Sequence, residues 1–404
     1  MSFEPFDAGK EELTQPAIGE RIAVIRTSDR INFKRCRRRW AWNSHLKQNL
    51  GPKETVGALW YGSGMHFALE DYHGNNVYGH PAEALRAYYQ ATKATRHLQQ
   101  LPGDVEDLMP LGIGMMHYYA DYWLKQRDTL RTYIHDGVPQ VEVNALCEIN
   151  LSMFPRWLKR HYDRVLYSAT FDRVVVDEED RLWIVDYKSA KRITTTHFQT
   201  DPQVGAYCWL GNYIYGRPIE GLIYQQHRKE LPDDPRILAD GRISTAKAQK
   251  VTHPIYRAAL VNLYGADFTR WPEENLDFLN WLATEETPTA DHFIRRDRLS
   301  RNFHSHEAEG EKILMEIEDM LDPTLPLYPN PTRDCPYCPF YTPCINVDDG
   351  SDFKGELQIS YQPRPKAFDQ WRQHLPQPVH PPKVPGLSQP QQLEPPQQPQ
   401  LQQS

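Results

Sequence analysis

Two carboxylates and a lysine on neighbouring extended segments are the residues of this sequence best suited to catalysis. In ATFDRVVVDEEDRLWIVDYKSAK, Asp172 lies near the start of one apolar run, and Asp186 and Lys188 lie two residues apart on the next. Carboxylate oxygens are the ligands that Mg²⁺ or Mn²⁺ prefers, and such an ion can activate water and stabilise charge developing on a phosphate. An ammonium group beside them can hold or help deprotonate that water and contact the phosphate. The trio predicts metal-dependent phosphodiester hydrolysis, although a solvent-facing strand with ordinary ion pairs can also carry D-x-K.

A β-hairpin is predicted to position the trio. The DEED group lies between Val- and Ile-rich runs, which is typical of a turn between two strands. Because side chains alternate along a strand, Asp186 and Lys188 share a face, and antiparallel pairing about the turn brings Asp172 beside them. Elsewhere the patterns predict helices over 27–46 and 60–130, strands between about 140 and 190, a helix over FQTDPQVGAYCWLGNYIYG, a strand over GLIYQQHR and a mostly helical stretch to about 325.

Four of the six cysteines form a second group. Cys36 stands alone near the start, and Cys335, Cys338 and Cys344 follow late in the chain as C-x2-C-x5-C. This distribution favours one four-ligand metal site over a redox dithiol or a set of disulfides. Four thiolates suit either Zn²⁺ or an iron-sulfur cluster. The other two cysteines, in apolar surroundings, are predicted core residues: Cys147 and Cys208.

The order of these residues resembles the RecB-like branch of the PD-(D/E)XK nuclease superfamily. Its iron-sulfur members include CRISPR-associated adaptation exonucleases, AddB-type helicase-nucleases and related phage exonucleases. Asp172 and Asp186-Tyr187-Lys188-Ser189 match the two catalytic motifs, and the similarity spans about residues 28–346. The further matches are Gly64-Met65-His66 with Leu69-Glu70 to the upstream histidine motif, Gln203 and Tyr207 to Q-x-x-x-Y, and SDRINFKRCRRRW and NPTRDCPYCPFYTPC to the cluster-binding ends.

The resemblance implies an α/β fold, a mixed sheet flanked by helices, with a helical insertion and a terminal region stapled by a structural [4Fe-4S] cluster on the four cysteines. It implies a metal-dependent DNA exonuclease acting on single-stranded or end-bearing DNA. In that reading Mg²⁺ or Mn²⁺ is held by Asp172, Asp186, His66 and a main-chain carbonyl near Tyr187. Lys188 positions the water, and Gln203 and Tyr207 align the strand. The alternative is a non-catalytic iron-sulfur or zinc DNA-binding component of a recombination or repair complex.

Basic residues beside the first cysteine are candidate phosphate contacts, although a basic helix face can also simply be solvated. They are Lys34, Arg35, Arg37, Arg38 and Arg39. A second basic run comprises Arg295, Arg296, Arg298 and Arg301, and two weaker candidates for an acidic contact precede the hairpin: Glu142 and Glu148.

The composition and length of the chain limit the classes of protein to which it can belong. The chain has 404 residues, 40% of them hydrophobic, and a net charge of −7, so any basic surface for DNA must be local. No apolar run approaches a membrane span and the N-terminus lacks signal-peptide features, which indicates a cytosolic protein, in a bacterium or a phage-infected host. Because the G-x-x-x-x-G-K-[ST] loop is absent, a helicase or recombination partner would act in trans.

Three regions are predicted along the chain. Residues 1–20 are acidic and unpatterned, and are expected to be mobile. Residues 21–350 form the nuclease domain, with the helical insertion at about 60–135. Residues 351–404 are rich in Pro and Gln and are expected to be disordered, because such a composition buries little apolar surface.

Overall fold

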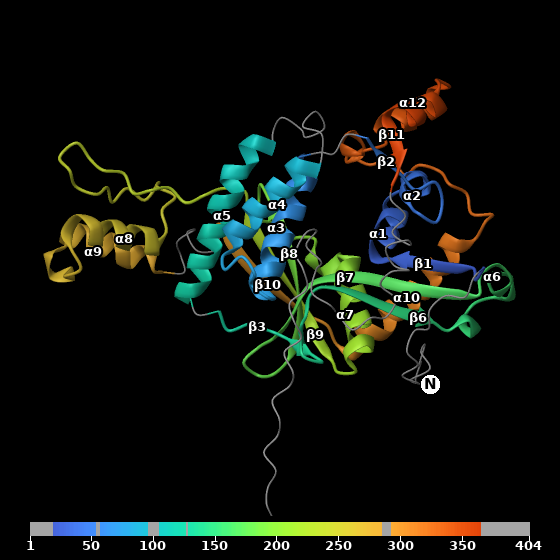
Figure 1. The fold of residues 1–404 in the computed structure, drawn as a ribbon, viewed down its shortest axis with the longest axis horizontal. Coiled ribbons are helices and arrows are strands. Elements are labelled where there is room, and N and C mark those ends of the chain that lie inside the picture. The colour runs from blue at the N-terminus through green and yellow to red at the C-terminus, as the bar shows by residue number, and fades with distance from the viewer. Residues whose placement is uncertain (1–18, 54–56, 96–104, 127, 285–291, 365–404) are drawn as a thin grey trace, which may run out of the picture.

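A mixed β-sheet forms the centre of the molecule (Figure 1). The computed structural model describes residues 19–53, 57–95, 105–126, 128–284 and 292–364. Within these ranges the sheet has seven strands, and its main path runs β1-β7-β8-β9-β10, with β3 and β6 also paired to β7. The strands are β1 (Ile22–Arg26), β3 (Arg131–Thr132), β6 (Val141–Ile149), β7 (Arg164–Val176), β8 (Leu182–Ala190), β9 (Ile219–Arg228) and β10 (Ile294–Ser300).

Strand β7 is the longest strand of this sheet and changes partners along its length. On one edge its first residues pair in parallel with β1 and its last residues pair antiparallel with β8, while β6 pairs antiparallel with most of its other edge. Strand β8 then runs parallel to β9, which pairs antiparallel with β10. Because β7 is covered on both faces, nearly every residue of RVLYSATFDRVVV is buried, as is usual for a central strand. The β7–β8 turn falls at the DEED group, where the sequence predicts it.

Helices cover both faces of the sheet, which confirms the predicted α/β fold class. Apolar side chains of one helix group pack on one face and those of the other group on the opposite face. The first group is α1 (Thr27–Arg35), α2 (Arg37–Asn43), α6 (Arg156–His161), α7 (Pro202–Tyr215) and α10 (Phe303–Leu321). The second is α3 (Gly57–His73), α4 (Pro81–Thr95) and α5 (Val105–Gln126), which lie in the region predicted as a helical insertion.

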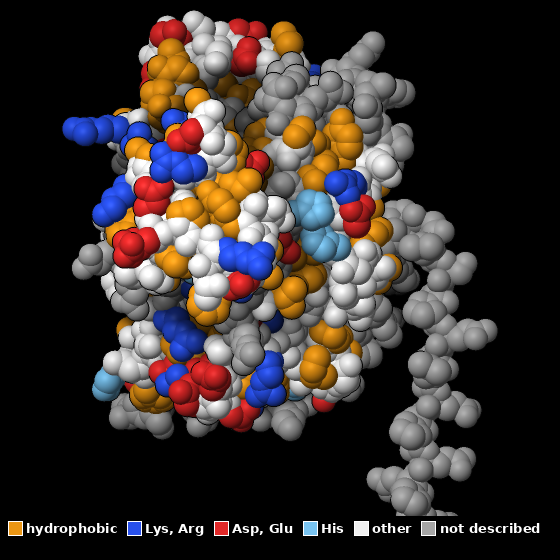
Figure 2. Space-filling view, turned by 90° about the vertical axis from the view of Figure 1, so that its left-hand side faces the viewer, with side chains coloured by type: hydrophobic (Ala, Val, Ile, Leu, Met, Phe, Trp, Pro, Cys, Tyr) orange, Lys and Arg blue, Asp and Glu red, His pale blue; other side chains and the backbone are white. Residues whose placement is uncertain are grey.

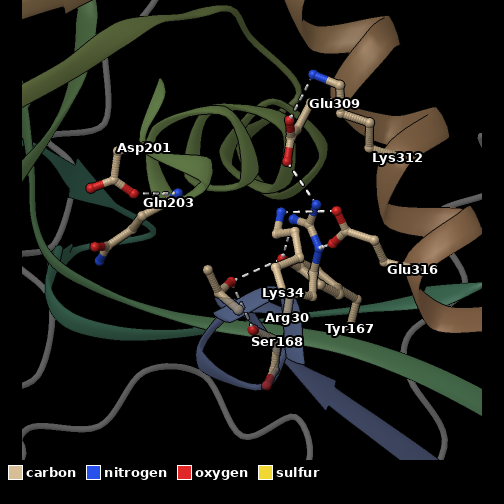
Figure 3. A network of polar contacts seen from close by, with 10 residues as sticks. Arg30, Lys34, Tyr167, Ser168, Asp201, Gln203, Glu309, Lys312 and Glu316 are labelled. Carbon is tan, nitrogen blue, oxygen red and sulfur yellow. Dashed lines mark hydrogen bonds and ion pairs between the residues drawn. The ribbon is translucent and has the colours of Figure 1, made fainter. Parts of the chain in front are cut away.

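A buried arginine joins α1, α10 and β7 (Figure 3). Arg30 is fully buried; its Nη2 donates to Glu309 at 2.9 Å and its Nε to Glu316 at 2.5 Å. It also donates to the hydroxyl of Tyr167 at 3.2 Å. Because a buried charge is unfavourable unless it is paired and hydrogen-bonded, this network fixes the position of α1 on the sheet.

Two helices between β9 and β10 form a small lobe beside α5 (Figure 1). They are α8 (His253–Tyr264) and α9 (Glu273–Leu282), and they share a separate apolar core that includes Tyr256, Leu260 and Phe278. On the face that carries this lobe, acidic and basic side chains are intermixed (Figure 2). Among the described residues that this view shows, the basic side chains do not form one continuous surface of the kind that a phosphate backbone would need.

The chain after α10 returns to the N-terminal helices. Strand β11 (Tyr361–Pro363) pairs with β2 (Leu50–Pro52), and the buried side chains of Trp42, Phe340, Leu357 and Tyr361 form a small core there. The remaining elements of this segment are η5 (Cys335–Tyr337), α11 (Tyr341–Asp349) and α12 (Phe353–Ser360). Short elements elsewhere are β4 (Ile134–His135), β5 (Val138–Pro139), η2 (Leu151–Met153), η3 (Phe198–Thr200) and η4 (Phe268–Arg270).

Three sequence-based predictions need correction. The helix predicted over 27–46 is two helices, because Cys36 has an extended backbone. The predicted helical stretch to about 325 contains β10, an edge strand. The tail predicted as disordered from 351 is ordered to residue 364, because two of its apolar side chains are buried in the small core. Residues 1–18 and 365–404, the rest of the predicted mobile N-terminus and tail, lie outside the described residues.

Candidate active site

Asp172 and Asp186 lie where β7 and β8 separate. The two strands pair from Arg173 opposite Val185 to the turn, and the two aspartates are the next residue beyond that point on each strand. There the backbone N–H of Tyr187 donates to Asp172 Oδ2 at 2.7 Å, so a side chain replaces the missing backbone partner. Both carboxylates are buried. The hairpin therefore brings them together, as the sequence predicts.

Lys188 and Gln203 hold the Asp186 carboxylate in place. Lys188 Nζ lies 2.9 Å from Asp186 Oδ1 and 2.7 Å from Oδ2, and Gln203 Nε2 donates to Oδ1 at 2.9 Å. Gln203 is set in the first turn of α7, whose N-terminus is capped by Asp201, which accepts from the Gln203 N–H (Figure 3). Although Asp186 Oδ2 is paired with the ammonium, it accepts no well-directed hydrogen bond. It can therefore also serve as a cation ligand.

His66 and Glu142 complete the cluster from two other elements. His66, on α3, has Nδ1 3.1 Å from Glu142 Oε1 and 3.5 Å from Asp172 Oδ1. One ligand atom from each of these three residues lies within 4.8 Å of the others. Imidazole nitrogen and carboxylate oxygens suit a divalent cation such as Mn²⁺, so the donor set fits the ion that the sequence predicts.

Glu142 was only a weak candidate from sequence. It lies on β6, where its neighbours Val141 and Val143 pair with Arg173 and Phe171, so that Glu142 stands opposite Asp172. The signal that identifies it is therefore the register of β6 on β7. That register depends on the long connection between the strands, which no local sequence pattern specifies.

Crowded charges shift the protonation of the cluster. Burial opposes the charge on His66, but its hydrogen bond to Glu142 and the charge of Asp172 outweigh burial and raise the pKa of His66 to about 9. Burial, and then the neighbouring Asp186, raise the pKa of Asp172 well above its ordinary value. Burial likewise raises the pKa of Glu70, one turn after His66, to about 7. Several perturbed pKa values in one cluster are typical of a functional site.

Lys188 keeps its charge in this setting. Burial would lower its pKa, but the carboxylates of Asp186 and Asp172 outweigh burial and hold the pKa above the ordinary value. A lysine in the ammonium form can position groups but cannot act as a base, because a base would need the neutral amine.

The two tyrosines predicted for the site occupy different places. Tyr207 is buried on α7, packs edge-on against Phe171, and lies close enough to the aspartates that, after burial, their charges raise its pKa further. The side chain of Tyr187 stacks on His73 and lies edge-on to the ring of His66, with the ring centroids 6.5 Å apart. Its main chain contacts the carboxylates, through the N–H that donates to Asp172.

Most of the basic run beside Cys36 is already paired with acidic side chains. Arg37 differs, because its guanidinium lies over the rings of Phe33 and Tyr328. The Arg39 backbone N–H donates to Cys36 Sγ at 3.5 Å. The ion pairs are Lys34 with Glu316, Arg35 with Asp334 and Arg38 with Asp348. These three cations are not free phosphate ligands in this structure, and DNA binding by the run stays a prediction.

The second basic run is also engaged within the protein. Most of it lies on β10, where alternate residues face opposite sides of the sheet. Its contacts are Arg295 with Asp297, Arg296 with Asp128 and over the ring of Trp123, Arg298 with Asp177 and over the ring of Trp183, and Arg301 with Gln199.

The four predicted cysteine ligands lie around the junction of α1 and α2. Cys36 is the junction residue, Cys335 is the first residue of the turn η5, Cys338 directly follows that turn, and Cys344 is on α11. Arg38 Nη1 donates to Cys344 Sγ at 3.4 Å. Burial raises the pKa of the Cys344 thiol against the opposing effect of Arg38, and Cys36 is near enough to add to the rise.

All four of these thiols are free and half-buried, and two accept backbone N–H groups. Thr332 donates to Cys335 Sγ at 3.2 Å, as Arg39 does to Cys36. Within the described ranges, no three cysteine sulfurs lie within 4.8 Å of one another. Cys147 and Cys208 are buried in the main core, in keeping with their predicted role.

Comparison with models of protein families gives a match over most of the chain. A model of the PD-(D/E)XK nuclease superfamily matches residues 30–345. Among solved structures, one similar chain is described as "Putative exonuclease" from Eubacterium rectale, with 13% identity and a TM-score of 0.33, covering 70% of this chain and 87% of that chain. No curated protein matches the sequence. No helix in the ranges that the structure describes is long and apolar enough to cross a membrane.

Proposed function

Because the chain belongs to the PD-(D/E)XK nuclease superfamily, we propose that it is a divalent-metal-dependent DNA exonuclease. The observation that carries this proposal is the contact of Asp186 with Lys188 and Gln203, directly beside Asp172, where β7 and β8 separate. Two carboxylates, an ammonium group and an amide on rigid elements are the components that phosphodiester hydrolysis requires. The substrates we propose are single-stranded DNA and DNA with free ends.

The residues divide into those that hold the ion and those that position the reactants. Asp172, Asp186 and His66 would hold Mg²⁺ or Mn²⁺, with the main-chain carbonyl of Tyr187 beside them. When bound, this ion supplies an activated water and offsets charge on the phosphate and the leaving oxygen. Lys188, kept protonated by Asp186, would hold that water and meet the phosphate charge.

Helix α7 supplies the positioning residues. Gln203 donates to Asp186 and lies 3.5 Å from Lys188 Nζ through its Oε1, so it links the carboxylate to the ammonium. Tyr207, one turn later on the same helix, packs against Phe171 and keeps that face of the helix on β7. We propose that this pair aligns the DNA strand with the carboxylates.

We also propose that Cys36, Cys335, Cys338 and Cys344 hold a structural [4Fe-4S] cluster, as in the RecB-like branch. A tetrahedral zinc site needs sulfurs about 3.8 Å apart, given Zn–S bonds of about 2.3 Å. No three described cysteine sulfurs lie within 4.8 Å of one another, so the choice of a cluster over zinc rests on the C-x2-C-x5-C spacing and its resemblance to the RecB-like branch. Free thiols of this kind need a reducing compartment, which supports a place in the cytosol. Any strand separation would come from a helicase or recombination protein in trans.

Linear and circular DNA test the proposal together. The protein, purified anaerobically, is incubated with end-labelled linear single-stranded DNA, linear duplex and circular single-stranded DNA, with Mg²⁺ or Mn²⁺ and with EDTA. We expect the linear substrates to be degraded only with the ion, and the circle to survive. Cutting of the circular DNA would show endonuclease activity. That result would exclude the assignment as an exonuclease but keep the assignment as a nuclease. If the wild type and Asp186→Ala both leave all substrates intact, the proposed enzyme activity is wrong.

A further inference from the structure

Three arginines from separate elements gather where β1 ends. Arg26 is the last residue of β1, Arg39 lies on α2, and Arg364 directly follows β11. Strand β11 pairs with β2, and the backbone N–H of Arg364 donates to the carbonyl of Asn49 at 2.8 Å, which fixes this segment beside β2. The guanidinium of Arg364 then lies over Gly51, with its Nε 2.8 Å from the position that a Cβ on Gly51 would occupy.

The positive charges of this arginine cluster exceed the negative charge beside it. Arg26 is paired with the buried Asp29 through Nε and Nη2, at 2.8 and 3.0 Å, so its Nη1 remains available. Among the described residues, neither Arg39 nor Arg364 is paired with a carboxylate, and Arg39 Nε is buried without a hydrogen-bond partner. Burial and the charges of Arg26 and Arg39 lower the pKa of Arg364, although Asp29 opposes them. The three guanidinium groups therefore repel one another, and an anion would relieve the repulsion.

Strand β7 connects the arginine cluster with the catalytic carboxylates. Arg26 pairs with Ser168, and Asp172 lies four residues further along β7, which is about 13 Å at the usual rise of a strand. Because side chains alternate along a strand, Arg26 and Thr170 face the same side of the sheet. Thr170 is partly exposed, and its hydroxyl donates to the exposed Asn144 of β6 at 3.1 Å. In Figure 1 this part of β7 lies between α3 and α1. A polar surface therefore leads from the carboxylates toward the arginines.

We propose that Arg26, Arg39 and Arg364 form a phosphate site that binds the backbone of the DNA strand away from the bond that is cut. This inference rests on the proposed function, because it concerns the path of the same substrate. The separation of about 13 Å corresponds to about four phosphates of a stacked strand and to about two of a fully extended one. Guanidinium groups suit this ligand, because their planar N–H groups can bind two phosphate oxygens at once.

Affinity for single-stranded DNA and its salt dependence test the proposal without any assay of cleavage. Fluorescence anisotropy gives the Kd of metal-free protein in EDTA for a labelled oligonucleotide at several salt concentrations. We expect Arg39→Gln and Arg364→Gln each to weaken binding about tenfold and to reduce the slope of log Kd against log salt by about 0.7. Arg156→Gln is the matched control, because Arg156 is an exposed arginine on α6, which precedes the opposite end of β7. A Kd and a slope equal to those of the wild type in both variants would overturn the proposal.

Neutral linkages in the DNA locate the bound phosphate and do not depend on the folding of a variant. Methylphosphonates replace the phosphates of the oligonucleotide one at a time, counted from each end. With the wild type we expect one or two internal positions to weaken binding about tenfold, and with the double variant Arg39→Gln/Arg364→Gln the same positions should have no effect. An equal loss at every linkage, or a loss only when a terminal phosphate is removed, would overturn the proposal. Binding with the expected pattern but without cleavage in Mg²⁺ or Mn²⁺ would count against the proposed function alone.

Discussion

Two regions of the protein are predicted to hold metal: the carboxylate region around Asp172 and Asp186, and the cysteine region of Cys36, Cys335, Cys338 and Cys344. The surrounding structure holds the side chains of the two regions in different ways. Asp172 and Asp186 lie on central strands, and each is held by a specific donor, the Tyr187 N–H in one case and Lys188 and Gln203 in the other. The cysteines lie on a helix junction, a short turn and a short helix, where the sulfurs accept N–H groups at 3.2–3.5 Å.

This difference indicates which region depends on its metal. The carboxylate cluster is formed by the sheet and its helices, so a catalytic ion would enter a preformed site. The small core beside the cysteines, around Trp42 and Phe340, is separate from the main core and joins the two ends of the domain. There a metal group would contribute folding energy, because binding and ordering occur together. Loss of a carboxylate should therefore remove activity, and loss of a cysteine should remove stability.

The largest effect should follow from Asp186→Asn. The change keeps the shape of the side chain but removes an ion ligand and the counter-charge of Lys188. We expect kcat/KM on end-labelled DNA to fall by about 10³ to 10⁴ fold, which corresponds to about 4 to 5.5 kcal/mol of transition-state stabilisation.

The thermal midpoint should change little in that variant, because the loss of the repulsion with Asp172 offsets the loss of the ion pair with Lys188. Asp180→Asn is the matched control, because Asp180 lies in the turn of the same hairpin and is exposed. If Asp186→Asn loses activity only because it unfolds, the carboxylate region also determines stability, and the proposed difference between the two regions is wrong.

The link between the two regions should be tested next with Arg30→Met. Arg30 fixes α1, which leads directly to Cys36, onto β7 and α10 (Figure 3). Removing it leaves the carboxylates of Glu309 and Glu316 without their buried partner, so we expect a loss of about 3–5 kcal/mol in the free energy of unfolding, measured by denaturant titration.

Lys34→Met provides the comparison for Arg30. Lys34 pairs with the same Glu316 but is exposed, so its replacement should lower the free energy of unfolding by less than about 1 kcal/mol. Equal losses in the two variants would show that the buried network has no special role in holding α1.

Local patterns were sufficient to predict the carboxylate site but not the whole of its surroundings. The DEED turn sets the register of β7 on β8, so the proximity of Asp172, Asp186 and Lys188 follows from the sequence. The position of Glu142 opposite Asp172 depends on the register of β6 on β7, and these strands are joined by a long connection. Contacts between residues far apart in sequence therefore determine it. The place of a residue in a tight hairpin is thus easier to predict than its place across a long connection.

The periphery was harder to predict for a different reason. Strand β10 reads IRRDRLS, where charged residues dominate, because an edge strand at the end of a sheet can present charge to solvent and to other elements. The helix break at Cys36 has no Gly or Pro to mark it. The ordering of α12 and β11 depends on Leu357 and Tyr361, two apolar residues in a polar segment. None of these features has a strong local signal.

Replacement of Cys338 by alanine should have a smaller effect than Arg30→Met. If a cluster is bound, loss of one ligand weakens it by about 10 to 100 fold, and the free energy of unfolding falls by about 1.5–3 kcal/mol. The thermal midpoint of anaerobically purified protein should fall together with its iron and sulfide content. Tyr337→Ala is the control, because Tyr337 is the adjacent, highly exposed residue. A midpoint and an iron content equal to those of the wild type would exclude Cys338 as a ligand.

The smallest effect should be a pH dependence that belongs to the carboxylate region alone. The folded-state pKa of His66 is about 9, above its ordinary value near 6.5, because Glu142 and Asp172 favour the charged imidazole. A raised pKa contributes stability that is fully present below about pH 6.5 and is lost as pH rises toward 9. In metal-free protein we expect a fall on the order of 1 kcal/mol over this range, once solvent screening is allowed for.

The variant His66→Gln should have a shallower slope, because the contribution of the imidazole is removed while Asp172 and Glu70, whose pKa values are also raised, keep theirs. The variant His304→Gln, which removes an exposed imidazole, should keep the wild-type slope. Cys338→Ala should also keep the slope, although its stability is lower at every pH, because the two regions contribute separately. Denaturant titrations of the metal-free proteins at pH 6, 7.5 and 9 measure the effect. If His66→Gln retains the wild-type slope, the charged imidazole is not held by Glu142 and Asp172 in solution. If Cys338→Ala loses it, the two regions are coupled, and the separation between a preformed carboxylate site and a metal-dependent cysteine region does not hold.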